Sequence, residues 1–244
     1  MNVFAGSGDG EIEKSTYGAS WAQTRGASDG TAATYAGTDG PSLTSCYSLS
    51  APWFIIVRSF FPFDTSVVEG VITAATLHVW CTFKNDILLD GHGKIYLVKT
   101  SQASPSQLVK ADFDQVGEIL GSDTVIACAD LVENAYNAFP LNAVGLAWIN
   151  QSGWTLLGLR EGHDLENVAP VATGLSISRW AYSEDADPNH RPYLEITTGP
   201  TAKPYPTSML RKKRVSGYHC FMNAYIKAKV GGFDPLKLPD GTVF

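Results

Sequence analysis

Two histidines lie in loops rich in carboxylates and are the residues best suited to acid–base or metal chemistry. His92 follows Asp90 in an Asp-Gly-His-Gly turn, and His163 stands between Glu161 and Asp164. Imidazole titrates near neutral pH and is a common metal ligand. No second histidine lies at ligand spacing, and the chain has no G-x-S-x-G, H-E-x-x-H or phosphate-loop motif. We therefore predict no catalytic residues, no metal site and no cofactor.

Two acidic turns could supply oxygen ligands to a structural calcium ion. They are Gly8-Asp9-Gly10-Glu11 and Glu184-Asp185-Ala186-Asp187. Solvated turns are the favoured interpretation. The four cysteines are far apart and form no C-x-x-C pair, which argues against metal or redox use; they are Cys46, Cys81, Cys128 and Cys220.

Four aromatic residues are candidates for binding a glycan by stacking against a sugar ring. They are Trp53, Trp80, Trp180 and Tyr182. Each lies in or beside a strand-like run, where most aromatic side chains belong to the core, so we expect about one of the four to be exposed for binding.

The charge of the chain is uneven. Eight of the 18 basic residues but only two of the 24 acidic ones follow residue 202, so this segment carries +6 and the preceding 202 residues carry −12. Three prolines predict a stiff linker after Gly199. Four adjacent basic residues then precede an amphipathic helix predicted from Ser216 to about Val230, followed by an extended tail. The basic residues are Arg211, Lys212, Lys213 and Arg214.

We predict that this arm, residues 200–244, docks onto an acidic protein surface. Four aromatic residues would be its buried anchors: Tyr218, Phe221, Tyr225 and Phe233. Nucleic acid is disfavoured because the acidic remainder of the chain would repel phosphate. Membrane binding is disfavoured as well, because the helix is short and flanked by helix breakers.

The elements that must position these residues are predicted to be β-strands. The stretch from Trp53 to Phe83 contains two runs of β-branched and aromatic residues separated by a turn. In the second run the apolar residues Ala75, Leu77, Val79, Cys81 and Phe83 alternate with polar or mixed ones, which is typical of a sheet packed on one side.

Further strands are predicted at 11–14, 94–99, 117–127, 135–141, 155–160, 175–182 and 193–198. A short helix over 143–150 is predicted from its N-cap, Asn142. About eight to ten short strands favour an all-β, antiparallel two-sheet jelly-roll sandwich over residues 1–199, with a closed barrel as the alternative. The chain shows no secretory signal pattern and no apolar run of membrane-spanning length, so we expect it to fold in a cytoplasm.

Several motifs in this order resemble disaggregatase-related β-sandwich modules, which are similar to carbohydrate-binding modules and also occur in bacteriophage virion proteins. The resemblance covers roughly residues 10–198, and residues 200–244 have no counterpart in it. The motifs are Tyr17–Ala19, Arg25–Ala27, Arg58–Ser66, Ile72–Leu77, Gly145–Asn150, Leu157–Arg160, Tyr182–Glu184 and Arg191–Ile196.

The resemblance implies a non-enzymatic structural protein of a phage particle, as a head decoration, head fibre or tail accessory. Its partners would be capsid or tail subunits, it would form a homo-oligomer in the virion, and its arm would anchor it there. The alternative is a carbohydrate-binding module that recognises host-surface glycans. A glycan-cleaving enzyme is the third hypothesis, and it would need two carboxylates facing each other across an aromatic-lined groove.

Overall fold

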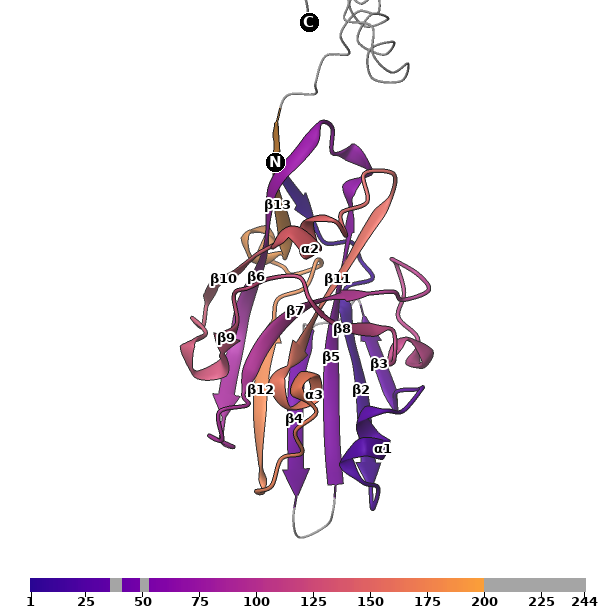
Figure 1. Ribbon diagram of the computed structural model, residues 1–244, viewed down its shortest axis with the longest axis vertical. Helices are drawn as coiled ribbons and strands as arrows, with labels where there is room; N and C mark the ends of the chain where they lie inside the picture. Colours follow the sequence, from indigo (N-terminus) through magenta and orange to yellow (C-terminus); the bar gives the residue numbers. More distant parts are fainter. Residues whose placement is uncertain (36–40, 49–52, 200–244) are drawn as a thin grey trace, which may run out of the picture. The chain divides into compact units, whose positions relative to one another are not determined.

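The computed structural model describes residues 1–35, 41–48 and 53–199 (Figure 1). The structural statements below refer to these residues. Residues Met1–Pro200 form one compact unit. The predicted arm, with its basic cluster and aromatic anchors, lies outside the described residues. Hydrogen bonds connect thirteen strands, and every pair is antiparallel. The predicted all-β sandwich is confirmed.

The strands are β1 (Asn2–Phe4), β2 (Gly10–Tyr17), β3 (Ala32–Tyr35), β4 (Ser42–Ser48), β5 (Trp53–Asp64), β6 (Val71–Asp86), β7 (Lys94–Thr100), β8 (Val116–Leu120), β9 (Ile126–Ala127), β10 (Ala135–Pro140), β11 (Trp154–Glu161), β12 (Gly174–Trp180) and β13 (Tyr193–Gly199).

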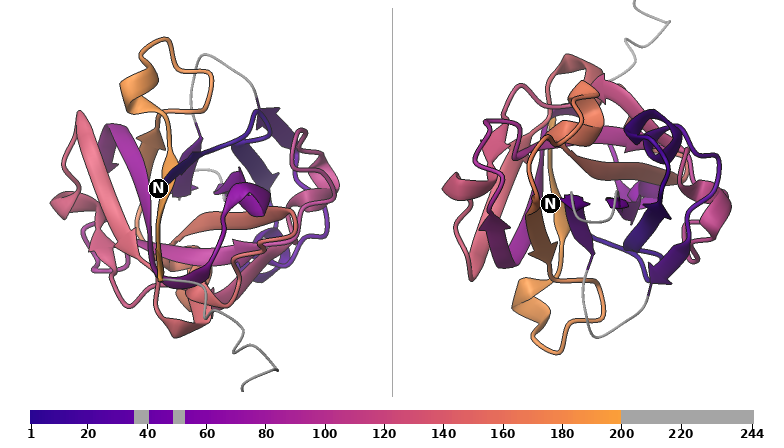
Figure 2. Two further views of the ribbon diagram at one scale, coloured as in Figure 1. Left: turned by 90° about the horizontal axis from the view of Figure 1, so that it is seen from above. Right: turned by 90° about the horizontal axis from the view of Figure 1, so that it is seen from below.

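Two long strands organise the two layers of the sandwich. In one layer β6 pairs with β10, β12 and β13, and β1 extends that layer beyond β13. In the other layer β5 pairs with β2, β4 and β11, and β7 and β8 follow β11. The β12–β4 pair keeps the layers hydrogen-bonded along one side, so the strands surround the interior when seen from above and below (Figure 2). This continuity is a feature of the barrel alternative, although the strand order still ends at β1 and β8.

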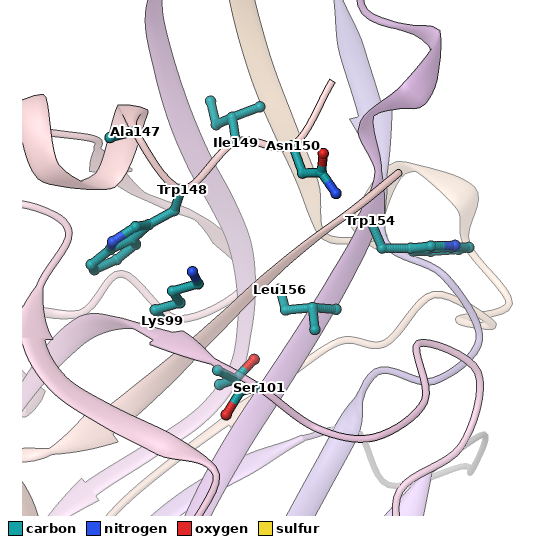
Figure 3. Close-up of a pocket in the computed structure, with 9 residues that line it drawn as sticks. Lys99, Ser101, Ala147, Trp148, Ile149, Asn150, Trp154 and Leu156 are labelled. Atoms are coloured by element: carbon teal, nitrogen blue, oxygen red, sulfur yellow. The ribbon is translucent and has the colours of Figure 1, made fainter. Parts of the chain in front are cut away.

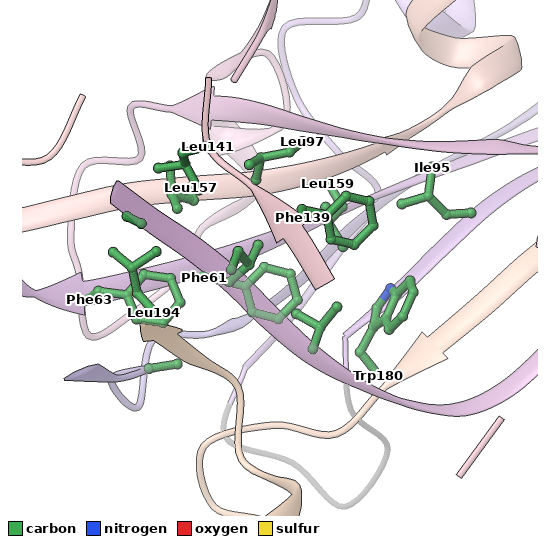
Figure 4. Packing of buried hydrophobic residues seen from close by; sticks show 14 of the residues in the cluster. Phe61, Phe63, Ile95, Leu97, Phe139, Leu141, Leu157, Leu159, Trp180 and Leu194 are labelled. Carbon is green, nitrogen blue, oxygen red and sulfur yellow. The ribbon is translucent and has the colours of Figure 1, made fainter. Parts of the chain in front are cut away.

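The main core lies between the layers (Figure 4). Phe61 and Phe63 of β5 meet Leu77 of β6, Phe139 of β10 and Leu159 of β11, and all five side chains are completely buried. Each contributes about 1.5–3 kcal/mol by leaving water. The predicted alternation along β6 is confirmed up to Cys81, after which Phe83 is 39% exposed.

A second core covers the opposite face of β5. Ile56 and Phe60, whose side chains alternate with those of the main core, pack with Ile12, Val98 and Phe113. Residues on both faces of β5 are therefore buried, which explains why this strand is apolar along almost its whole length rather than alternating.

Three short α-helices occur in the described part of the chain, where one was predicted. They are α1 (Trp21–Arg25), α2 (Ala143–Leu146) and α3 (Gly162–Glu166). The Asn142 cap of α2 is confirmed, because its side chain accepts hydrogen bonds from Val144 N and Gly145 N, both at 3.0 Å. The helix nevertheless ends four residues before the predicted end at Asn150. No described helix is long and apolar enough to cross a membrane.

Candidate functional site: a cleft between two tryptophans

An open cleft of about 530 Å³ lies where β7 and β11 separate (Figure 3). The two strands pair from Glu161↔Ile95 to Leu157↔Lys99. Beyond that point Trp154 to Leu156 stay paired with β5 but lose β7 as a neighbour. The turn that follows α2 supplies the remaining wall. The volume falls within the range of about 300–1,000 Å³ that is usual for small-molecule sites.

Two tryptophans line this cleft, and each lies directly against a glycine. A Cβ at Gly121 would come within 2.2 Å of the Trp148 ring, and a Cβ at Gly6 would come within 2.7 Å of the Trp154 ring. Only glycine allows the backbone to approach the indoles this closely. The glycines therefore set where the rings stand, and Trp154 remains 37% exposed.

The turn between the two tryptophans is tied to the sheet by buried hydroxyl groups. Thr65 Oγ1 donates to Asn150 O at 2.8 Å and lies 2.6 Å from Thr155 Oγ1. Asn150 N donates to Thr155 Oγ1 at 2.9 Å. These bonds fix the backbone of Asn150 and with it the spacing of the two indoles, so the cleft is preorganised.

The polar side chains of the cleft are Lys99, Thr100, Ser101 and Asn150, with Leu156 and Ile149 supplying apolar surface. In Figure 3 the side chain of Lys99 lies between Trp148 and Leu156. Aromatic walls combined with a few polar groups are the arrangement that binds amphipathic ligands such as sugars, whose rings have apolar faces and hydroxyl edges.

Of the four aromatic residues predicted to bind a glycan, Trp180 cannot do so. It is completely buried in the main core, because its strand position faces the space between the layers. Trp53 is 44% exposed at the start of β5, where its Nε1 donates to Ser15 Oγ at 2.7 Å. Tyr182 is half-buried just after β12. Neither Trp53 nor Tyr182 lines the cleft.

Trp80 is half-buried in a row of rings on the outer face of β6, β10 and β13. His190 stacks on Trp80 with a centroid distance of 4.0 Å, and Tyr136 meets Trp80 edge-on at 5.2 Å. His78 and Tyr193 stack on each other at 4.5 Å. These rings already cover one another's faces, so Trp80 presents less free surface than its strand position suggests.

The two site-like histidines occupy neighbouring ion-pair networks, with ring centroids 5.4 Å apart. Buried His163 contacts Glu161 Oε1 through Nδ1 at 2.8 Å and Asp90 Oδ2 through Nε2 at 2.9 Å. Burial alone would lower its pKa, but the two carboxylates outweigh it and raise the pKa of His163 to about 9. His92 Nδ1 contacts Glu166 Oε2 at 2.6 Å.

The two acidic turns meet each other. Asp9 is completely buried, and its carboxylate accepts hydrogen bonds from Ser183 N at 2.7 Å and Ser183 Oγ at 2.8 Å. Burial and the nearby Glu184 carboxylate raise the pKa of Asp9 to about 7 in spite of these bonds. Among the described residues, no group of three or more His, Cys, Asp or Glu could hold a metal ion.

The sequence interpretation missed the cleft. Trp148 falls within the helix predicted over 143–150, and Trp154 lies outside the strand predicted over 155–160. The available signal was the polar turn Asn150-Gln151-Ser152-Gly153 with a tryptophan on each side. Turns lie at the surface and often carry binding residues, so aromatic residues at both ends of a polar turn indicate a candidate site.

No protein-family model matches the chain, and no curated protein does. Among solved structures, a xylan-binding module, CBM15, aligns with 82% of this chain and 99% of its own length at 7% identity and a TM-score of 0.40. Xylanase10C from Cellvibrio japonicus, in complex with xylopentaose, aligns over 84% of this chain and 29% of its own length at 10% identity and a TM-score of 0.39. At such TM-scores neither likeness bears on what this chain binds.

Proposed function

We propose that the β-sandwich is a non-catalytic carbohydrate-binding domain and that the cleft between Trp148 and Trp154 is its binding site. The observation that carries the proposal is that two indoles, each packed against a glycine, line one preorganised open cleft. Each indole can stack on the apolar face of a sugar ring, while Asn150 and Ser101 are placed to exchange hydrogen bonds with hydroxyl groups. An open cleft with two stacking residues fits at least two consecutive sugars of a chain.

Binding to a glycan array, followed by titration calorimetry with the best ligands, tests this proposal. We expect Trp148→Ala and Trp154→Ala each to weaken affinity about tenfold or more, because each removes a stacking surface. Trp53→Ala is the matched control, since it also removes an exposed indole, but one outside the cleft. Circular dichroism of each variant separates lost binding from lost folding. Equal affinity for all three variants, or no ligand for the wild-type protein, would refute the assignment.

The virion setting remains a proposal that rests on the sequence resemblance and on the basic arm. It is compatible with glycan binding, because a module attached to a particle can present its cleft to host-surface glycans. In that setting, deletion of residues 200–244 abolishes incorporation into the particle and leaves glycan affinity unchanged. If the protein without residues 200–244 still joined the particle, the arm would not be its anchor.

A further inference from the structure

Among the described residues that line the cleft, Lys99 is the only charged one. These residues also include one asparagine and no aspartate or glutamate. This is unexpected in a part of the chain that carries −12. The cleft therefore presents positive charge to a ligand and no fixed negative charge that would repel an anionic one.

The orientation of Asn150 supplies a hydrogen-bond donor. Its Oδ1 accepts a hydrogen bond from Ser152 N at 3.1 Å, which identifies the other amide atom as Nδ2. That amino group makes no hydrogen bond to any described residue, and Figure 3 shows it on the side of Asn150 that faces Trp154. Asn150 therefore presents a free donor to a ligand in the cleft.

Lys99 supplies the charge. Its amino group has no ion pair or hydrogen bond within the described parts of the chain, although it stands beside a half-buried indole. Two other lysines are engaged: Lys84 donates to the carbonyl groups of Ala129 and Leu131, and Lys94 pairs with Glu166 at 3.4 Å. Within the described residues the ammonium group of exposed Lys110 is unpaired like that of Lys99, but it lies outside the cleft. An unpaired ammonium group at an aromatic wall leaves a local positive potential that an anionic ligand would neutralise.

We infer that the cleft selects a glycan with an anionic substituent, a carboxylate or a sulfate, and that Lys99 is the residue that determines this specificity. The inference rests on the proposed glycan-binding function. The indoles hold the sugar rings, which supply affinity for any chain of suitable shape. Lys99 then binds the acidic group through charge-assisted hydrogen bonds, which are about twice as strong as neutral ones, and Asn150 Nδ2 donates to a hydroxyl group of the sugar chain.

The test begins with an array of neutral, uronate-bearing, sialylated and sulfated glycans. The best carboxylate ligand is then compared by calorimetry with its carboxyl-reduced counterpart, which keeps the sugar chain and loses the charge; the best sulfated ligand is compared with its desulfated form. Wild type, Lys99→Met and Trp154→Ala are measured with each ligand. Lys110→Met is the matched control, because Lys110 is also exposed and lies outside the cleft.

We expect wild type to lose about tenfold or more in affinity when the ligand charge is removed. Lys99→Met should bind the charged and uncharged ligands equally, at the weaker level, while Lys110→Met behaves as wild type. The carboxylate and sulfate arms show which anion the cleft accepts. Neutral ligands that bind as tightly as charged ones, or discrimination that survives in Lys99→Met, would overturn this inference and leave the glycan site standing. Failure of Trp154→Ala to weaken the binding of any ligand would instead overturn the site.

Discussion

The replacement Asp164→Asn should remove a large part of the stability of this domain. Asp164 is 1% exposed and lies between two buried arginines, Arg58 and Arg160, which are 3% and 1% exposed. Each guanidinium group binds both carboxylate oxygens, through four hydrogen bonds of 2.7–2.8 Å. Arg58 also lies over the Phe113 ring, 4.0 Å from its centroid. One buried carboxylate thus compensates most of the charge of two cations that water does not reach, and the exposed Glu118 lies 3.7 Å from Arg160 Nη1.

Asparagine has the same shape but no charge, and its amino group would face guanidinium donors. Removing one partner of a buried ion pair costs about 3–5 kcal/mol, because the remaining charge stays buried without compensation. That is about a fifth or more of the 5–15 kcal/mol by which domains are usually stable. At a urea m-value of about 2 kcal/mol/M, the unfolding midpoint should fall by roughly 2 M.

Urea unfolding followed by tryptophan fluorescence measures this loss. Glu118→Gln is the control, since Glu118 pairs with Arg25 and lies 3.7 Å from Arg160 Nη1 but has a side chain that is 64% exposed. This replacement should cost less than about 1 kcal/mol. Burial would raise the pKa of Asp164, yet Arg58 and Arg160 hold it well below its usual range. The stabilisation by Asp164 is therefore present above pH 4 and is lost on further acidification. The stability of Asp164→Asn should not show this loss at acidic pH. Equal midpoints for Asp164→Asn and Glu118→Gln would refute the reasoning.

Two other buried groups should give pH-dependent stability of identifiable origin. The folded-state pKa of Asp9, about 7, exceeds its ordinary value of 3.8, so its contribution is complete below pH 3.8 and declines as pH rises through 7; at 1.36 kcal/mol per pKa unit the change approaches about 4 kcal/mol. Asp9→Asn should abolish this decline in urea titrations between pH 4 and 8, and an unchanged profile would exclude Asp9 as its source. The pKa of His163, about 9 against an ordinary 6.5, gives stabilisation that is complete below pH 6.5 and lost as pH rises through 9. In thermal melts of His163→Gln the melting temperature should not fall over this alkaline range as it does in wild type. A fall of wild-type size would contradict the assignment to His163.

Local patterns were sufficient to predict the sandwich. Alternation from Ala75 to Cys81 identified the inward face of β6, and the Asn142 cap located α2, because both signals depend on residues close in sequence. The helix α1 was missed even though Ser20 and Gln23 form a capping box. Its five residues show too little periodicity to reveal a helix, and Trp21 is held by packing in the second core.

The position of the cleft depends on contacts that the sequence does not display. Gly6 and Trp154 are far apart in the chain, as are Gly121 and Trp148, yet each pair meets at a distance that only glycine permits. The burial of Trp180 was equally hidden, because a strand residue at the layer-linking β12 can face either side. Strand alternation separates two faces but does not say which face another layer will cover.

The motifs that carried the family resemblance turn out to be largely structural. Arg58 and Arg160 each belong to one of these motifs, and both form buried ion pairs with Asp164. Of the cleft residues considered above, Trp148 and Asn150 lie within a motif, whereas Trp154 and Lys99 lie outside every motif. A related chain could therefore keep the buried ion cluster, and hence the fold, while replacing the indole or the ammonium group that would contact a glycan. It follows that the resemblance predicts the scaffold, whereas the ligand specificity that we propose depends on Trp154 and Lys99, which the resemblance does not cover.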